Sequence, residues 1–248
     1  LARGYTVFAN GGYLVDPYLV ERVYDRNGVV VQQARPLLAC RDCEERLLAE
    51  SAVAAHDGFD LSVAGSPGSG RVAVNSALEV GPPERFLAPR AVDERTTYLV
   101  QSLLRDVVKR GTGRGALVLE RDDIGGKTGT TNDFRDAWFS GFAGGLVTTA
   151  WVGMDDFSSL GRGEFAAKAA LPMWNGFMKV ALEGVPEVEP PLPNGLVTAL
   201  IDRSSGRLVP AGSPGAMSEL FKAEDIARLE SRADASNTIS QREAFDIF

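Results

Sequence analysis

The most informative segment of this 248-residue chain reads Gly125-Gly126-Lys127-Thr128-Gly129-Thr130-Thr131-Asn132. A single lysine stands here among small and hydroxylated residues, at the end of a largely apolar run that begins at Ala116. The run predicts a β-strand over residues 116–130, interrupted at Asp122 and Asp123, because acidic pairs are disfavoured inside strands. The segment therefore places a lysine near the end of a strand.

One interpretation of this segment is a phosphate-binding loop, since Gly126, Lys127 and Thr128 match the end of the motif G-x-x-x-x-G-K-[ST]. That loop needs its first glycine five positions before Gly126, where this chain has Arg121. It also needs a helix after the lysine to direct N–H groups at phosphate. A strand pattern with Trp138 and Phe139 follows instead, which excludes the nucleotide interpretation.

A second interpretation is the K-T-G element of penicilloyl-serine transferases, at Lys127, Thr128 and Gly129. The cation of Lys127 can attract the terminal carboxylate of a peptide and help a neighbouring hydroxyl to move a proton. Gly129 lets the substrate backbone lie against the strand. Thr130 can give its N–H to an oxyanion and its hydroxyl to the carboxylate. The structural alternative is a strand that ends in a polar turn.

Regular elements are predicted on both sides of this segment. An apolar stripe predicts a helix over 93–110, capped by Asp93. Strands are expected at 137–143 and 146–154, joined by a short turn and therefore antiparallel. A second helix is expected over 164–182, with a kink at Pro172. The order of these elements predicts an α+β fold with a mainly antiparallel sheet flanked by helices.

The remaining segments are described more coarsely by the sequence. The chain opens inside an amphipathic helix that stops at residues 10–12, so we expect a fragment of a longer protein. A hairpin is predicted over 18–33, with its turn at Asn27-Gly28. Residues 34–91 have the composition of a loop-rich insertion with a short helix at 44–55. Beyond a proline-rich spacer at 190–193, a strand pair is expected at 196–201 and 207–209, before a peripheral acidic tail.

Composition excludes several classes of protein. The chain has 26 basic and 33 acidic residues, so its net charge of −7 argues against a nucleic-acid partner. An apolar fraction of 44% is sufficient for a hydrophobic core and excludes disorder for most of the chain. No run approaches 18 consecutive apolar residues, so no membrane span is predicted in this segment of the protein.

Further motifs surround the central segment in a fixed order. They are Arg110-Gly111-Thr112-Gly113-Arg114, Asp136-Ala137-Trp138-Phe139-Ser140-Gly141, Trp151-Val152-Gly153 and Ala170-Leu171-Pro172-Met173-Trp174. Together with the opening residues 1–12 and the turn at 201–206, they resemble the C-terminal part of the transpeptidase domain of class A penicillin-binding proteins, closest to the 1A type of Gram-negative bacteria. The resemblance covers residues 1–32 and 92–210 well, and the insertion and tail poorly.

The resemblance implies the fold of penicillin-binding transpeptidases and serine β-lactamases, with only its C-terminal portion in this chain. Residues 1–184, including the insertion at 34–91, would belong to the transpeptidase domain, and residues 185–248 to a strand pair and tail. It implies a peptidoglycan D,D-transpeptidase that cross-links stem peptides through an acyl-serine and is acylated by β-lactams. No metal or other cofactor is expected. Lys127 and Thr130 would be catalytic, and substrate would contact Thr128, Gly129, Thr131 and Asn132. Asp136, Trp138 and Phe139 match family positions that are as readily structural.

The sequence departs from the family in one important respect. The family also needs Ser-x-x-Lys and Ser-x-Asn motifs, but none of the five lysines has a serine three positions before it, and no Ser-x-Asn occurs. The resemblance therefore implies that a preceding segment or a partner chain supplies the nucleophile. It also implies a glycosyltransferase domain, a membrane anchor and a location at the periplasmic face of the inner membrane. The rival from another class is a non-catalytic scaffold that binds peptidoglycan or partner proteins.

Two cysteines lie close together in the insertion, at Cys40 and Cys43. A lone C-x-x-C lacks the second ligand pair of a structural zinc site, so a local disulfide or free thiols are favoured over metal. His56, the single histidine, is interpreted as a surface residue rather than a catalyst.

Overall fold

The computed structural model describes residues 1–41, 43 and 87–234. The chain divides into two compact units, Leu1–Val92 and Asp93–Phe248. No helix in the described residues is both long enough and apolar enough to cross a lipid bilayer.

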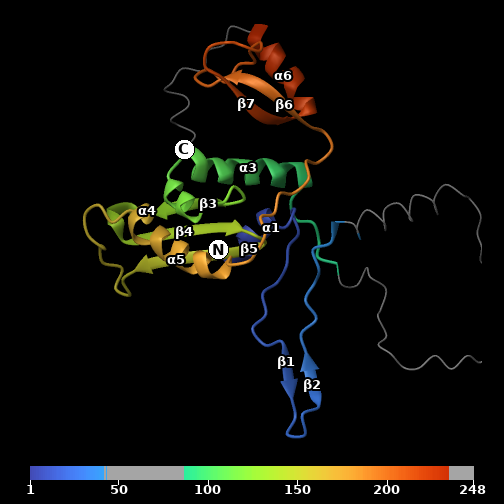
Figure 1. The fold of residues 1–248 in the computed structure, drawn as a ribbon, viewed down its shortest axis with the longest axis vertical. Coiled ribbons are helices and arrows are strands. Elements are labelled where there is room, and N and C mark those ends of the chain that lie inside the picture. The colour runs from blue at the N-terminus through green and yellow to red at the C-terminus, as the bar shows by residue number, and fades with distance from the viewer. Residues whose placement is uncertain (42, 44–86, 235–248) are drawn as a thin grey trace, which may run out of the picture. The chain divides into compact units, whose positions relative to one another are not determined.

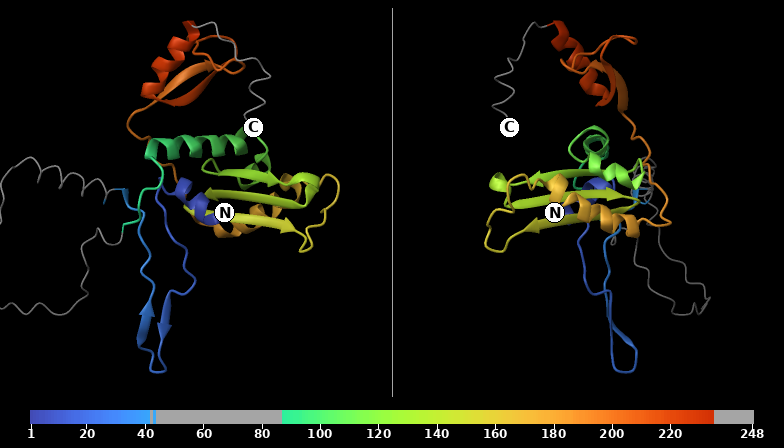
Figure 2. Two further views of the ribbon diagram at one scale, coloured as in Figure 1. Left: turned by 180° about the vertical axis from the view of Figure 1, so that it is seen from behind. Right: turned by 60° about the vertical axis from the view of Figure 1, so that its left-hand side comes forward.

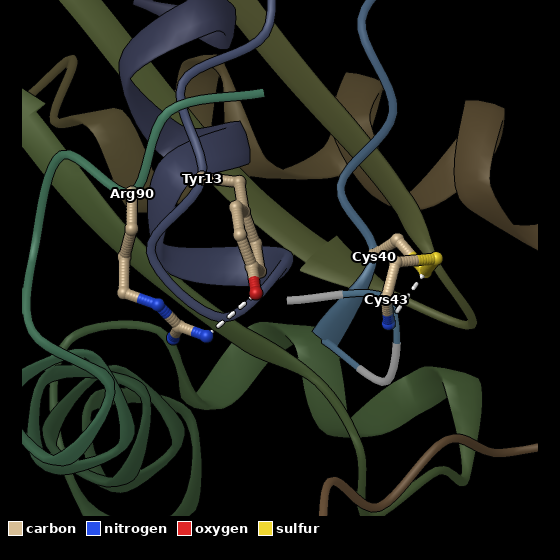
Figure 3. The surroundings of a disulfide bond; sticks show 4 residues. All are labelled: Tyr13, Cys40, Cys43 and Arg90. Carbon is tan, nitrogen blue, oxygen red and sulfur yellow. Dashed lines mark hydrogen bonds between the residues drawn. A yellow bond between two sulfur atoms is a disulfide. The ribbon is translucent and has the colours of Figure 1, made fainter. Parts of the chain in front are cut away.

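The first unit opens with helix α1 (Ala2–Ala9), which ends at Asn10, as predicted. The amide side chain of Asn10 stops the helix because it accepts a hydrogen bond from the Tyr13 N–H and donates one to the Tyr13 carbonyl, both at 3.0 Å. Tyr13 is buried, and its hydroxyl accepts a 2.6 Å hydrogen bond from Arg90. The guanidinium of Arg90 also lies 4.4 Å from the centre of the Tyr13 ring. These contacts join the two ends of the first unit (Figure 3).

The predicted hairpin is confirmed in the first unit. Strands β1 (Arg22–Tyr24) and β2 (Val30–Gln33) are antiparallel, and both are exposed along their length. The Asp25 carboxylate holds the turn by accepting hydrogen bonds from the N–H groups of Asn27 at 2.8 Å and Val29 at 2.9 Å. Gly28 follows with a φ of +79°, a conformation that glycine adopts without strain.

The cysteine pair forms a disulfide between Cys40 and Cys43, which was one of the favoured alternatives (Figure 3). The helix predicted over 44–55 and the single histidine, His56, lie outside the described residues.

The second unit is built on an antiparallel sheet with the order β3-β4-β5 (Figure 1). Its strands are β3 (Gly125–Thr130), β4 (Asp136–Ala143) and β5 (Leu146–Gly153). The tight turn between β4 and β5 consists of Gly144 and Gly145, whose φ values of +56° and +80° suit a two-residue hairpin turn. The strands predicted at 137–143 and 146–154 are confirmed.

Helices pack on this sheet from two directions. Helix α3 (Glu94–Arg110) runs along β3, while α4 (Ala166–Ala169) and α5 (Leu171–Ala181) contact the sheet through β3, β4 and β5 (Figures 1 and 2). Asp93 caps α3, as predicted, by accepting a 3.0 Å hydrogen bond from the Thr96 N–H. The core centres on Phe139 of β4 and Trp174 of α5, both fully buried, with ring centroids 5.0 Å apart in an edge-to-face arrangement.

Two predictions in this unit were wrong in detail. Residues Arg114–Leu119 form a 3-10 helix, not the first part of a strand. The sequence signal was misleading because a short apolar run has no period that separates a strand from a tight helix. The helix expected over 164–182 is two helices that meet at Ala170, and Pro172 lies in the first turn of α5, where its missing N–H costs nothing.

The C-terminal residues form a hairpin of β6 (Leu196–Asp202) and β7 (Ala216–Lys222), followed by α6 (Ala223–Asp234). The predicted strand partner at 207–209 was wrong, because it contributes only an isolated bridge between Leu208 and Ile201. The partner of β6 lies further along the chain, in the segment that composition marked as tail. The assignment of residues 1–184 and 185–248 to separate parts stays a prediction.

Charged side chains connect β7 and the start of α6 to α3. Arg95 donates two hydrogen bonds to the Glu224 carboxylate, at 2.9 and 3.0 Å. Arg110 donates to Glu219 at 2.7 Å, and Lys222 donates to the Thr96 hydroxyl at 2.9 Å. Each contact is partly exposed and contributes little to stability by itself, so its main effect is to define which surfaces of α3, β7 and α6 meet.

A buried ion pair anchors the start of β3. The side chain of Asp123 is 4% exposed, and it accepts two hydrogen bonds from Arg121, both at 2.9 Å. It also accepts the N–H groups of Gly144 at 2.8 Å and Val188 at 3.0 Å. One carboxylate, two positions before β3, thus connects the start of this strand to the β4–β5 turn and to the segment after α5.

These contacts change the pKa of the Asp123 carboxyl. Burial raises it, but the hydrogen bonds from Arg121, Val188 and Gly144 and the charge of Arg121 outweigh burial, so the pKa lies below its ordinary value. A carboxyl with a lower pKa in the folded chain stabilises the fold above its unfolded-state pKa. That stabilisation is lost as the pH falls through the folded-state pKa.

We expect Asp123→Asn to lower the free energy of unfolding at pH 7 by about 3 kcal/mol, because it leaves Arg121 buried without its charged partner. Urea denaturation measures the change, and the exposed neighbour Asp122 provides the control, since Asp122→Asn should change stability by less than about 0.5 kcal/mol. The difference between wild type and Asp123→Asn should begin to shrink below about pH 4, where the carboxyl of the unfolded chain becomes protonated, and should be lost once the pH has fallen through the lower folded-state pKa. Equal losses for the two variants would contradict an anchoring role for Asp123.

Candidate active site

Strand β3 lies at one edge of the sheet, and no other described strand pairs with its outer side. The Thr131 N–H donates to the Asp136 carbonyl of the neighbouring strand segment, at 3.1 Å. Bonded and non-bonded pairs alternate along an antiparallel ladder, so the N–H and C=O groups of Thr128 and Thr130 point away from β4. A peptide could therefore add to β3 as a further strand, with Thr130 as one of its hydrogen-bonding partners.

Lys127 is exposed and lies opposite Ser140 in the sheet register. Thr128, the next residue, lies opposite Phe139, which packs on Trp174 of α5. Since successive side chains of a strand alternate between faces, Lys127 projects from the face opposite α5. Its Nζ donates a 2.8 Å hydrogen bond to the Thr128 carbonyl, which keeps the cation close to the outer edge of β3.

The hydroxyl of Thr128 forms a hydrogen bond with a residue of the segment that follows α3. Its Oγ1 lies 2.6 Å from the Oγ1 of Thr112, and either oxygen can donate. Thr112 belongs to the Arg-Gly-Thr-Gly-Arg motif at 110–114, which the sequence analysis quoted without assigning a role to any of its side chains. No local pattern predicts this contact, because the two threonines are 16 positions apart.

Gly129 differs from the two glycines that begin β3. A Cβ on Gly126 would lie 2.7 Å from the Phe139 ring and 2.9 Å from the Ser140 carbonyl oxygen, so packing inside the protein excludes any side chain there. A Cβ on Gly129 would meet only the Cβ of Trp138, at 3.4 Å, and its φ lies outside the left-handed region. Neither backbone conformation nor internal packing thus requires glycine at 129, which is consistent with a ligand backbone approaching at this point.

Thr130 already has one structural contact. Its Oγ1 accepts a 3.0 Å hydrogen bond from the N–H of Ala166, the first residue of α4. The hydroxyl proton remains available to an acceptor, since a threonine hydroxyl both donates and accepts. Thr130 can therefore hold the start of α4 and contact a substrate carboxylate at the same time.

The next two predicted residues, Thr131 and Asn132, lie where β3 gives way to a 3-10 turn (Asn132–Phe134). The Thr131 hydroxyl accepts a 2.7 Å hydrogen bond from the Asp136 N–H and so closes the loop between β3 and β4. Thr130, Thr131 and Asn132 are also among the residues that line an open depression on the protein surface. All three of these predicted site residues therefore lie at the same depression.

The three family positions after the loop have structural contacts. The Asp136 carboxylate accepts a 2.9 Å hydrogen bond from the Trp151 indole, and the rings of Trp138 and Trp151 lie 5.8 Å apart. Phe139 is part of the core. These contacts favour the structural interpretation of Asp136, Trp138 and Phe139.

Among the described residues, no group of three or more His, Cys, Asp or Glu side chains could hold a metal ion. The thiols of Cys40 and Cys43 are joined to each other.

Comparison with known proteins identifies the family to which the chain belongs. Residues 1–155 match the family model described as the penicillin binding protein transpeptidase domain. Penicillin-binding protein 1A of Pseudomonas aeruginosa is 42% identical over 227 residues, which cover 91% of this chain and 27% of that protein. Penicillin-binding protein 1A of Escherichia coli is 36% identical over 244 residues. The match covers 86% of this chain and 29% of the Escherichia coli protein.

A solved structure agrees with these matches. The crystal structure of penicillin-binding protein 1A from Haemophilus influenzae superposes with a TM-score of 0.68 at 35% sequence identity, over 90% of this chain and 31% of that one. The chain thus spans less than a third of the length of these relatives.

An antiparallel sheet with helices packed on it confirms the α+β class, and its structural neighbour has the fold of a penicillin-binding protein. The chain belongs to the penicillin-binding protein transpeptidase family, and the resemblance found in the sequence is confirmed.

Glycine substitutions distinguish a ligand-facing position from a packing position. We expect Gly129→Ala to change the free energy of unfolding by less than about 1 kcal/mol, because the added methyl group has room and the backbone is unstrained. Gly126→Ala should cost about 2 kcal/mol or more, because Phe139 and the Ser140 carbonyl must move. Denaturant unfolding of both variants measures the difference. A larger loss for Gly129→Ala than for Gly126→Ala would show that Gly129 is required by packing after all.

Proposed function

We propose that this chain supplies one wall of the active site of a serine D,D-transpeptidase that cross-links peptidoglycan stem peptides. The observation that carries the proposal is the outer edge of β3, where the exposed Lys127 adjoins Gly129 and the outward-facing backbone of Thr130. Membership of the transpeptidase family supports the class of reaction.

Each residue has a stated task in this proposal. The Lys127 ammonium attracts the terminal carboxylate of the peptide, and the Thr130 hydroxyl donates to it. The outward N–H of Thr130 stabilises the oxyanion that forms when a serine oxygen attacks the penultimate carbonyl. Thr128 is held by Thr112, and Gly129 leaves space for the substrate backbone. Thr131 and Asn132 contact the substrate beyond the strand end.

The reaction has two balanced steps. The serine oxygen forms an ester with the penultimate D-alanine, and the terminal D-alanine leaves as the free amine with the serine proton. An amine of a second stem peptide then attacks the ester, forms the new amide bond and returns the proton to the serine. A β-lactam acylates the same serine, and transfer to water instead of the amine is carboxypeptidase activity.

The nucleophile is not in this sequence, because no lysine has a serine three positions before it. In our proposal, a preceding segment or a partner chain supplies the Ser-x-x-Lys and Ser-x-Asn elements. The proposal also places the protein, with a peptidoglycan glycosyltransferase domain and a membrane anchor outside this sequence, at the periplasmic face of the inner membrane. Nucleic acid is not a partner in this proposal, and the reaction needs no cofactor.

The second candidate function is a non-catalytic scaffold that binds peptidoglycan or partner proteins. Acylation separates the two functions. The chain alone should not be labelled by fluorescent penicillin, whereas the protein that includes the preceding segment should be labelled. A full-length protein that is never acylated would favour the scaffold.

We expect Lys127→Ala to lower the rate of penicillin acylation of the full-length protein by about 100-fold or more, since general acid–base groups contribute at about this level. The matched control is Lys179→Ala, which removes an exposed lysine from α5 and should leave the rate unchanged. Stopped labelling reactions followed on gels give both rates. Equal rates for wild type and Lys127→Ala would overturn the assignment of Lys127.

Thr130→Val tests the two contacts of the threonine hydroxyl together. It should weaken acylation by carboxylate-bearing β-lactams about tenfold, because a charge-assisted hydrogen bond is lost, and it should also destabilise the start of α4 by about 1 kcal/mol. Thr130→Ser keeps the hydroxyl and should restore both properties. Normal acylation by Thr130→Val would exclude the hydroxyl from carboxylate recognition.

A further inference from the structure

The turn Gly111-Thr112-Gly113 joins α3 to the 3-10 helix Arg114–Leu119. The carbonyl of Val107, in the last turn of α3, accepts hydrogen bonds from the Gly111 N–H at 3.0 Å and from the Gly113 N–H at 2.9 Å. One carbonyl oxygen thus binds both glycines of the turn, and the backbone of Thr112 is fixed between them.

Close packing explains why the turn has a glycine on each side. A Cβ on Gly111 would lie 2.9 Å from both the Cα and the carbonyl oxygen of Val107. A Cβ on Gly113 would lie 3.2 Å from the same oxygen and 3.3 Å from the side chain of Val108. Val108 and Ala116, on the two sides of the turn, belong to the hydrophobic core. The turn is therefore held at both ends and folds tightly on the end of α3.

This fixed turn presents the exposed side chain of Thr112 to Thr128 of β3, with the two Oγ1 atoms 2.6 Å apart. Thr128 directly follows Lys127 in the strand, and the Lys127 Nζ donates a long hydrogen bond of 3.4 Å to the Thr128 Oγ1. The Thr128 hydroxyl therefore has two polar neighbours, one from its own strand and one from the turn after α3.

The donors and acceptors around Thr128 decide in which direction its hydroxyl can act. A threonine hydroxyl has one proton and can accept two hydrogen bonds, whereas the ammonium of Lys127 can only donate. When Thr112 donates as well, both acceptor positions of the Thr128 oxygen are used. The Thr128 proton is then available only to an acceptor outside this group. An ionised carboxylate, which accepts and cannot donate, is an acceptor of this kind.

We propose that Thr112 is a positioning residue of the active site, which donates to the Thr128 hydroxyl and so directs the Thr128 proton at the terminal carboxylate of the bound peptide. Thr112 acts through Thr128 and does not itself contact the substrate. Hydrogen bonds in a chain polarise one another, so the donor from Thr112 strengthens the bond that Thr128 makes. The inference rests on the proposed function, because it needs the carboxylate that Lys127 attracts.

The test uses the full-length protein, a penicillin and the methyl ester of the same penicillin. The ester has no free carboxylate, so the ratio of the two second-order acylation rate constants measures recognition of the carboxylate. Thr112→Val has nearly the same shape but no hydroxyl, and it should lower this ratio about fivefold, the scale of one hydrogen bond. Its rate constant with the ester should equal that of the wild type. Partial loss of folded protein would lower both rate constants equally and leave the ratio unchanged.

Further variants assign the effect to the hydrogen bond between the two threonines. Thr112→Ser keeps the hydroxyl and should restore the wild-type ratio. Thr128→Val removes the residue through which Thr112 acts, so adding Thr112→Val to this variant should lower the ratio no further. The control is Thr198→Val, which changes an exposed threonine of β6 and should keep the wild-type ratio.

The outcomes separate this inference from the proposed function. If acylation by penicillin depends on Lys127 but Thr112→Val keeps the wild-type ratio, the positioning role is wrong and the transpeptidase assignment stands. Equal slowing of the penicillin and ester reactions by Thr112→Val would show that Thr112 only supports the turn, and would also overturn the inference. A further loss in the Thr128→Val variant would contradict action through Thr128. A full-length protein that penicillin never acylates would overturn both proposals.

Discussion

The buried carboxylate of Asp123 is the constraint on which the second unit depends. Four hydrogen bonds reach it, from Arg121, the β4–β5 turn and the segment after α5. Together they determine where β3 begins and in which register it meets β4. Since breaking one side of a buried ion pair is costly, this arrangement resists slippage of the strand by a residue, which would move Lys127 to the opposite face.

The two halves of β3 have different roles. At its start, Gly125 and Gly126 have no room for side chains because aromatic rings of β4 lie against them. Further along, Lys127 and Thr130 are exposed, and Gly129 has space that the protein itself does not fill. Close packing thus holds one half rigid, so that the other half can present backbone and side-chain groups in fixed positions. This is the preorganisation that electrostatic stabilisation of an oxyanion requires.

Local patterns were sufficient for much of the fold. The cap at Asp93, the Asn27-Gly28 turn and the short β4–β5 turn each act within a few residues, so the sequence predicted the elements beside them. The strand partner of β6 could not be found in this way, because Ala216–Lys222 pairs with it across an intervening loop that itself contains an apolar run. Two further contacts were not predicted for the same reason, because each joins residues that are distant in sequence. They are the hydrogen bond between Thr112 and Thr128 and the contact of Arg135 with the Phe157 ring.

The sequence by itself determined the family, the α+β class and the K-T-G segment, since these are carried by ordered motifs and by residue types with a chemical task. It also showed that this chain contains no Ser-x-x-Lys. Only the tertiary structure decided that β3 is an edge strand, that Gly129 is not needed for packing, and that Arg135 faces a depression beside Thr130. The physical reason is that exposure, free volume and the direction of a backbone N–H depend on which distant segments lie next to a residue, and no local pattern encodes that.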